Sequence, residues 1–317
     1  MNIKKIGLTA LAASLVSVSA QAGEMSVNGG ASMAIKNNSG VDAGKAITMG
    51  NQLTFTGGGE LDNGLNVSLS FVLDHTDNIA SGFDSHSITV SSDALGSITI
   101  AGDGAGNAQS ALDTTAAGDI WNNGFKAGTT DVAYIAMAGS DASANSVYYT
   151  LPTLVDGLSI DASYSSGGLA VDSTTAFGAT YTGVEGLSVS YGVGENGSTV
   201  ATTSGDVTTM KASYAIGSFT AAVSNTESDK DSTGTDEEMD SWNLSYTVSE
   251  NLSISYGEET HETSGQTVDE EFDAISVSYT TGGMTITAAN YEASGIANTT
   301  GEAGEANRWK LAASFAF

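Results

Sequence analysis

The sequence predicts an all-β protein in which about 16 strands form one antiparallel up-and-down barrel that spans a membrane. Three observations lead to this fold class. Short runs of alternating apolar and polar residues fill most of the chain, and a period of two is the pattern of a strand with two unlike faces. Short and long connections alternate between the runs, as they do when turns gather at one rim of a barrel and loops at the other. The number of runs is also even, which such barrels require.

The first expected strand shows the alternation clearly. Met25, Val27 and Met33 are apolar, whereas Ser26 and Asn28 between them are polar. The same criterion assigns the remaining strands, with boundaries uncertain by a few residues. The expected strands lie near 24–36, 46–57, 65–71, 84–91, 96–101, 144–151, 158–165, 174–182, 187–194, 206–216, 218–226, 239–248, 252–259, 271–280, 284–292 and 308–317.

The N-terminus has the features of a secretory signal peptide. Lys4 and Lys5 form a basic start, an apolar run follows to Ala20, and Ala20-Gln21-Ala22 is a small-x-small cleavage site. The apolar run is too short for a spanning helix, which needs about 20 residues. We therefore expect residues 1–22 to be cleaved and residues 23–317 to form a single transmembrane β-barrel domain.

Composition limits the functions that remain. The chain has one proline, no cysteine and a net charge of −28. Without cysteine there is no disulfide, no thiol nucleophile and no zinc-thiolate site. Such an acidic chain is a poor ligand for nucleic acid, whose phosphates need clusters of Lys and Arg, and it attracts cations instead.

The side chains on the two faces favour a membrane barrel over a soluble one. The polar faces carry mostly Ser, Thr, Gly and Asn, which suit a water-filled lumen better than a solvated exterior. Aromatic residues recur near strand ends, as an interfacial girdle requires. They are Tyr164, Tyr181, Tyr191, Trp242, Tyr246, Tyr256, Tyr279, Tyr291 and Trp309.

Four features carry a family resemblance: the signal peptide, the alternating strands along the whole chain, the C-terminal Phe317, and the segment from Gly96 to Gly104 followed by a long link. Together they resemble the Gram-negative outer-membrane general porins, especially those of alphaproteobacteria. The resemblance implies a homotrimer of 16-stranded barrels among outer-membrane lipid and lipopolysaccharide, and a channel for passive diffusion of small hydrophilic solutes and cations. It also implies that the third loop, 102–143, folds into the lumen, and that Phe317 is an assembly signal.

Charges on and opposite the third loop are the candidate pore residues. The acidic candidates at the constriction are Asp103, Asp113, Asp119 and Asp131. Acids in a narrow passage favour cations, although some of these aspartates could instead cap turns. Strand parity places the basic candidates on the lumen wall, and they are Lys36, Lys211, Arg308 and Lys310. Because Arg308 is the only arginine, the arginine cluster of general porins is missing and a mild cation preference is expected.

One acidic segment partly matches a calcium loop. In the run from Asp229 to Asp240, Asp229 and Asp231 occupy the first and third ligand positions, Gly234 the sixth, and Asp236 adds another carboxylate. The flanking helices of an EF-hand are missing, so a solvated loop that attracts cations is the alternative. No cofactor is otherwise required, and the three histidines, which have no metal-ligand spacing, are expected at ordinary loop or rim positions.

Other functions make distinguishable predictions. No catalytic arrangement of residues stands out, so an enzyme is not expected. An exported β-solenoid or surface adhesin rich in Gly and Asp is the main alternative, but it predicts a fixed repeat that the sequence lacks. A substrate-specific barrel is a further alternative and would carry an aromatic or polar ladder along its lumen.

Overall fold

The computed structural model describes residues 25–38, 44–74, 85–103, 108–109, 112, 114–127, 130–131, 145–167, 172–196, 204–231 and 235–317. The expected signal peptide and His75 lie outside these residues. Within the described part of the chain, no helix is both long and apolar enough to cross a membrane.

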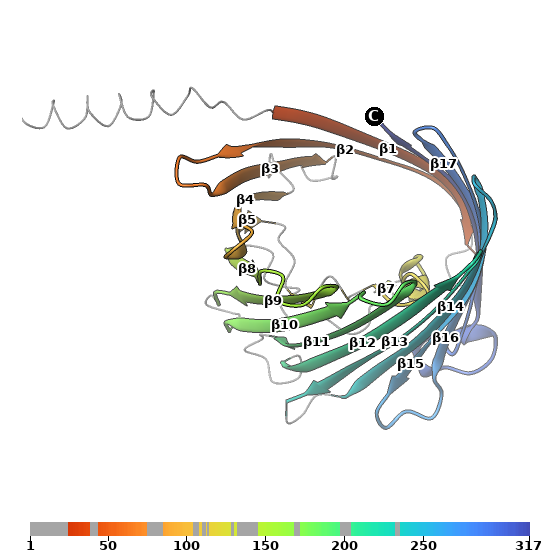
Figure 1. Ribbon diagram of the computed structural model, residues 1–317. Coiled ribbons are helices and arrows are strands. Elements are labelled where there is room, and N and C mark those ends of the chain that lie inside the picture. Colours follow the sequence, from red (N-terminus) through yellow and green to blue (C-terminus); the bar gives the residue numbers. More distant parts are fainter. Residues whose placement is uncertain are drawn as a thin grey trace, which may run out of the picture.

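Sixteen antiparallel strands close into one barrel, so the predicted fold class is confirmed (Figure 1). Each strand pairs with its neighbour in sequence, except that β5 pairs with β8 and β1 closes onto β18. The barrel strands are β1 (Met25–Asn38), β2 (Gly44–Glu60), β3 (Asn66–Asp74), β4 (Ser85–Ser92), β5 (Gly96–Asp103), β8 (Ser146–Thr150), β9 (Leu158–Ser165), β10 (Thr174–Tyr181), β11 (Leu187–Asn196), β12 (Gly205–Ile216), β13 (Phe219–Lys230), β14 (Glu237–Ser249), β15 (Leu252–Thr263), β16 (Glu270–Thr281), β17 (Met284–Ser294) and β18 (Ala306–Ala316).

The remaining described elements are short. A two-stranded sheet pairs β6 (Lys126–Ala127) with β7 (Thr130–Asp131), both within the long connection from β5 to β8. Three short 3-10 turns are η4 (Ile120–Asn122) in the same connection, and η5 (Ile296–Asn298) and η6 (Glu302–Gly304) between β17 and β18.

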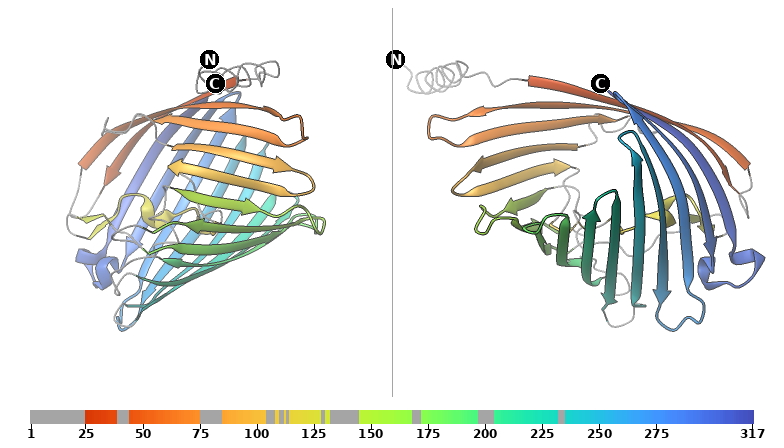
Figure 2. Two further views of the ribbon diagram at one scale, coloured as in Figure 1. Left: turned by 90° about the vertical axis from the view of Figure 1, so that its left-hand side faces the viewer. Right: turned by 45° about the vertical axis from the view of Figure 1, so that its right-hand side comes forward.

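The long strands differ from their expected bounds mainly at the end away from the short turns. β15 runs four residues past the predicted Glu259, to Thr263, and β14 begins two residues before the predicted Met239. Figure 2 shows these strands, in teal and blue, on the side of the barrel away from the shorter β3, β4 and β5, in orange. We call the end with the long connections the loop rim, and the opposite end, with turns such as Gly217 and Gly282, the turn rim.

The outward face is apolar, as expected for a membrane barrel. Along β14 the outward side chains Trp242, Leu244, Tyr246 and Val248 are all exposed. Eight of the nine aromatic residues expected in the girdle are exposed in this way, but Tyr291 is not. Tyr291 faces inward, where it packs against a cluster that contains Phe272. Parity along β17 already places Tyr291 with Thr285 and Thr287 on the polar face, so its assignment to the girdle was wrong. What the local sequence does not show is the apolar cluster inside the lumen that buries it.

Above the apolar band the outward face becomes acidic on one side of the barrel. On β16 the exposed Ile275, Val277 and Tyr279 give way to Asp273 and Glu271 toward the loop rim. The same change recurs on the neighbouring strands. We call these outward carboxylates the acidic belt: Glu227, Asp229, Glu238, Asp240, Glu258, Glu262, Glu271, Asp273 and Glu292.

Candidate pore constriction

The connection between β5 and β8, the predicted third loop, lies inside the barrel. Figure 1 shows its described elements, η4 and the β6–β7 sheet, within the ring of strands. Contacts with the inner wall fix its path, and they follow the order of the strands from β9 to β18. The prediction that a long non-alternating segment turns inward agrees with these contacts.

The loop first attaches near Ala108. The amide of Ala108 donates to Oγ of Ser163 on β9 at 2.9 Å. Nε2 of the buried Gln109 donates to the carbonyl oxygen of Val207 at 3.0 Å and to Oγ1 of Thr209 at 3.3 Å, both on β12. Ala108 also packs in a small apolar cluster with Ala176, Val207 and Met239. The first part of the loop is therefore held against two separate strands.

The next residues are bonded to successive strands through their backbone. Nζ of Lys211 on β12 donates to the carbonyl oxygen of Thr114 at 2.6 Å. The amide of Ala116 donates to Oγ of Ser224 on β13 at 2.9 Å, and that of Ala117 to Oγ of Ser241 on β14 at 2.8 Å. Small hydroxyl side chains on the inner face thus accept the hydrogen bonds that an irregular loop backbone cannot make within itself.

A single side chain, that of Glu259 on β15, accepts three hydrogen bonds from the loop. It is fully buried, and its Oε1 accepts from the amide of Ile120 and its Oε2 from the amide of Trp121, both at 2.8 Å. Oγ1 of Thr115 donates to Oε1 as well. A carboxylate that accepts several N–H and O–H bonds can compensate for its burial. Glu259 therefore binds both ends of the turn that leads into η4.

Apolar packing holds the tip of the loop. Ile120 and Phe125 are buried against Phe272 on β16 and Ile296 in η5. The rings of Phe125 and Phe272 lie 5.5 Å apart, centroid to centroid. An apolar cluster inside a polar lumen fixes the loop where hydrogen bonds alone would compete with water.

Glycines on the inner face make room for this path. A Cβ on Gly178 of β10 would lie 2.4 Å from the carbonyl oxygen of Ala108, and one on Gly192 of β11 would lie 2.7 Å from Cδ1 of Leu112. On β15, a Cβ at Gly257 would lie 2.9 Å from Cβ of Ala117. The loop rests directly on the sheet at these points, with its backbone at Gly178 and with side chains at Gly192 and Gly257. Glycine inside a strand often marks such a close approach.

The structure describes only one of the four predicted acids completely. Asp119 is half-buried and adopts a left-handed conformation, with φ of 55°. Its Oδ1 accepts from the amide of Thr115 at 2.9 Å, which is the turn-stabilising role named above as the alternative. The backbones of Asp103 and Asp131 end β5 and β7, but their side chains and all of Asp113 lie outside the described residues. Their role at the constriction stays a prediction.

The four predicted basic residues all lie on the inward face, but they are not equivalent. Lys36 and Lys310 are half-buried partners across the seam between β1 and β18. Arg308 is only 3% exposed and lies against the loop, since a Cβ on Gly124 would be 2.2 Å from its Nη1. Lys211 contacts the loop backbone. Two of the four therefore support the loop, and their action on solutes stays a prediction.

Sequence reasoning missed several residues of this site. Glu259 was not among the predicted pore residues, although its position on the same face of the strand as Ser255 places it inward. Asp161 on β9 is also inward and accepts from Oγ1 of Thr150 at 2.7 Å. His261, expected at an ordinary rim position, is 1% exposed. Parity within the predicted strand 252–259 would have found Glu259, and extending the alternation by two residues would have found His261.

The described residues of the segment with calcium-loop spacing lie at the end of β13 and the start of β14. Oδ1 of Asp236 accepts from the amide of Lys230 at 2.9 Å, Asp229 is the penultimate residue of β13, and Asp231 follows the strand. Among the described residues, which exclude 232–234, no group of three or more His, Cys, Asp or Glu side chains could hold a metal ion. Calcium binding here stays a prediction.

Comparisons with known proteins agree with this architecture. The family model for the Gram-negative porins matches residues 7–317. A porin structure refined at 1.8 Å resolution is similar, with a TM-score of 0.69 and 15% identity over 93% of this chain and 100% of that one. A loop-deletion mutant of OmpT from Vibrio cholerae has a TM-score of 0.65 and 17% identity, over 93% of this chain and 100% of its own.

A double mutant of the Rh. blastica porin gives a TM-score of 0.66 at 14% identity, again over 93% of this chain and 100% of that one. A search of the curated proteins finds no match. The structural likenesses show the fold, and the family model covers nearly the whole chain. This chain therefore belongs to the Gram-negative porin family, whose members are channel proteins of the outer membrane.

Proposed function

We propose that this porin is a passive diffusion channel for small hydrophilic solutes with a mild preference for cations. The observation that carries the proposal is the third loop, which is bonded in turn to β9, β12, β13, β14 and β15 within the lumen. A barrel of 16 or more strands leaves a wide aqueous channel, so an inward loop is needed to narrow it. Selectivity then depends on the width and the charge of the remaining passage.

Charge supports a cation preference. The whole chain carries a net charge of −28. Of the inward basic groups, Lys211 is bonded to loop carbonyl oxygens and Arg308 is buried, so both are partly withdrawn from the passage. Asp161 remains on the wall, half-buried. Acids that line a narrow passage disfavour anions there because like charges repel strongly where water is scarce.

A homotrimer is the assembly that the outer surface favours. The described outward faces of β1, β2, β3, β4 and β5 carry no Asp or Glu, whereas the acidic belt covers β13 to β17. Met25, Ile47 and Met49 on β1 and β2 are 73%, 80% and 77% exposed in the single chain. An apolar wall without the belt suits contact with other copies of the chain, and the wall with the belt is then left facing the surrounding membrane.

The test of channel function and of selectivity is a planar-bilayer recording with purified protein. Under a salt gradient we expect a reversal potential of the sign that indicates cation preference. Replacing Asp103, Asp113 and Asp119 together by Asn should bring that potential closer to zero, because it removes negative charge from the proposed constriction. Anion selectivity of the unmodified channel would contradict the charge argument, and an unchanged potential in the triple variant would mean that these acids do not line the narrow section.

The same preparation distinguishes the alternatives. A heat-sensitive, SDS-resistant oligomer from the outer-membrane fraction that conducts ions would agree with the porin. A soluble, secreted monomer without conductance would agree with the solenoid or adhesin. Calcium binding can be measured on this material by titration calorimetry, with the Asp229→Asn and Asp231→Asn double variant as control.

A further inference from the structure

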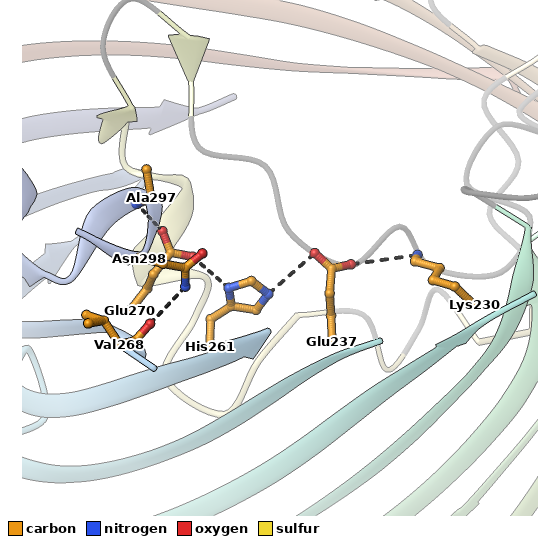
Figure 3. A network of polar contacts seen from close by, with 7 residues as sticks. All are labelled: Lys230, Glu237, His261, Val268, Glu270, Ala297 and Asn298. Carbon is orange, nitrogen blue, oxygen red and sulfur yellow. Dashed lines mark hydrogen bonds and ion pairs between the residues drawn. The ribbon is translucent and has the colours of Figure 1, made fainter. Parts of the chain in front are cut away.

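A row of charged side chains crosses the inner face of the barrel near the loop rim (Figure 3). Lys230, Glu237, His261 and Glu270 come from the four neighbouring strands β13, β14, β15 and β16. Nζ of Lys230 lies 3.7 Å from Oε2 of Glu237. Nε2 of His261 lies 3.6 Å from Oε1 of Glu237, and its Nδ1 lies 2.7 Å from Oε2 of Glu270. We call these four residues the charged row.

The charged row ends on η5, in the connection between β17 and β18. Oε1 of Glu270 accepts from the amide of Ala297 at 2.5 Å. Nδ2 of Asn298 donates to the carbonyl oxygen of Val268 at 2.8 Å, so the same turn is tied to the chain just before β16. Glu270 is 3% exposed. One carboxylate therefore joins His261 on one side to η5 on the other.

η5 in turn contacts the third loop. Ile296 is 4% exposed and belongs to the apolar cluster that contains Ile120 and Phe125 of the third loop. η5 also lies against β6. A displacement of η5 would remove one wall of the site that holds the tip of the loop.

We propose that His261 and Glu270 are positioning residues of the pore, in which the protonated imidazole holds the Glu270 carboxylate where it seats η5 against the third loop. The width and steadiness of the passage should then depend on pH. This inference rests on the proposed channel function, but the seating of η5 can be measured without it.

The groups around His261 give the direction of the pH dependence. Glu237 faces it from β14 and Glu270 from β16, and Lys230 lies beyond Glu237. On its own strand, Glu259 is the acid on the same inward face, two residues away, and Glu262 points outward. Burial acts to lower the pKa of His261, but the hydrogen bonds and negative charges of Glu237 and Glu270 outweigh burial and leave the pKa raised above 6.5.

This part of β15 stands above the apolar band, since the outward residues at its level are Glu258 and Glu262. For a histidine whose folded-state pKa is raised, the stabilisation is complete below the unfolded-state pKa and is lost as the pH rises through the folded-state pKa. The row should therefore hold η5 at mildly acidic to neutral pH. At alkaline pH, deprotonation would leave Glu237 and Glu270 without the cation between them.

The direct test follows η5 by spin labelling. The chain has no cysteine, so Thr300→Cys, at an exposed position after η5, gives a single attachment site. Label mobility is expected to rise through the same pH range in which NMR shows His261 losing its proton. His261→Gln, which cannot become charged, should give the mobile signal at every pH, and His261→Lys should keep the immobile signal to higher pH. His86→Gln is the matched control, because His86 is exposed on the outward face of β4.

Bilayer recordings supply the functional readout. Open-channel current noise of the unmodified protein should rise about twofold or more over the same pH range, and His261→Gln should show the high level throughout. If the protein does not conduct at all, the channel function fails, whereas the label still reports on η5. If label mobility in the unmodified protein and in His261→Gln is the same at every pH, the positioning role is wrong even when the channel conducts.

Discussion

Glu259 shows how a single side chain can hold a loop inside a water-filled barrel. Its two carboxylate oxygens accept hydrogen bonds from the backbone amides of Ile120 and Trp121 and from the hydroxyl of Thr115. These three donors come from both ends of one turn, and they have few other acceptors once the turn is pressed against β15. The carboxylate thus satisfies buried donors that the loop itself cannot satisfy.

Changing Glu259→Gln should loosen the third loop. The glutamine side chain keeps one oxygen acceptor, but its NH₂ group replaces the other carboxylate oxygen and meets a backbone N–H. At least one backbone donor therefore loses its acceptor, at a cost of about 1–3 kcal/mol. We expect faster proteolysis within the loop and a larger, noisier single-channel conductance, with the barrel still SDS-resistant. Glu258→Gln is the control, since Glu258 faces outward. Equal proteolysis in the two variants would contradict the role given to Glu259.

At the scale of the element, the third loop and the strands are fitted to each other. The loop runs over Gly178, Gly192 and Gly257, where any side chain would collide with it. On the same inner face, the hydroxyl groups of Ser163 and Ser224 accept hydrogen bonds from backbone amides of the loop. The small polar residues that a water-filled lumen tolerates are also the residues that allow a second layer of chain to lie on the wall.

Gly178→Ala should detach the first part of the loop. The new Cβ would lie 2.4 Å from the carbonyl oxygen of Ala108, so the loop must move off β10 and weaken its bond to Ser163. We expect higher single-channel conductance and a thermal midpoint that changes little, because the backbone pairing of β10 with β9 and β11 does not depend on the new methyl group. Gly57→Ala in β2 is the matched control, since a Cβ there meets nothing within 4 Å. A conductance of Gly178→Ala equal to that of the control would mean that the loop tolerates the displacement.

The element scale also shows what could be predicted from the sequence. Alternation located all sixteen strands, because each strand separates lipid from water and must show a period of two. Near the loop rim both faces of the strands are polar, so the apolar–polar alternation disappears there. Strands such as β15 were therefore predicted too short. The inward loop was indicated by the break in alternation, but its attachments were not. They join residues far apart in sequence, such as Thr115 and Glu259, and no local pattern encodes such pairs.

The whole molecule depends on closure between its first and last strands. Nine residue pairs join β1 to β18, from Gly30 with Ala316 to Asn38 with Arg308. Beyond them, Phe317 completes the seam: its amide donates to the carbonyl oxygen of Gly29 at 2.9 Å, and the amide of Gly29 donates back to Phe317 at 2.6 Å. A closed barrel leaves no unsatisfied strand edge in the membrane, so this seam is a condition for insertion as well as for stability.

The contact between β1 and Phe317 requires a residue without a side chain at position 29. A Cβ at this position would lie 2.3 Å from the ring of Phe317, whereas a Cβ on the adjacent Gly30 would lie 3.7 Å from the nearest atom, in ordinary contact. Gly29→Ala should therefore displace the terminal ring and slow closure, and deletion of Phe317 should slow it further by removing both hydrogen bonds. Folding into detergent micelles, followed by the heat-modifiable shift on SDS gels, measures closure directly, with Gly30→Ala as control. If deletion of Phe317 slows assembly in cells but not folding in micelles, the residue acts only as a recognition signal, and the seam closes through β1 and β18 alone.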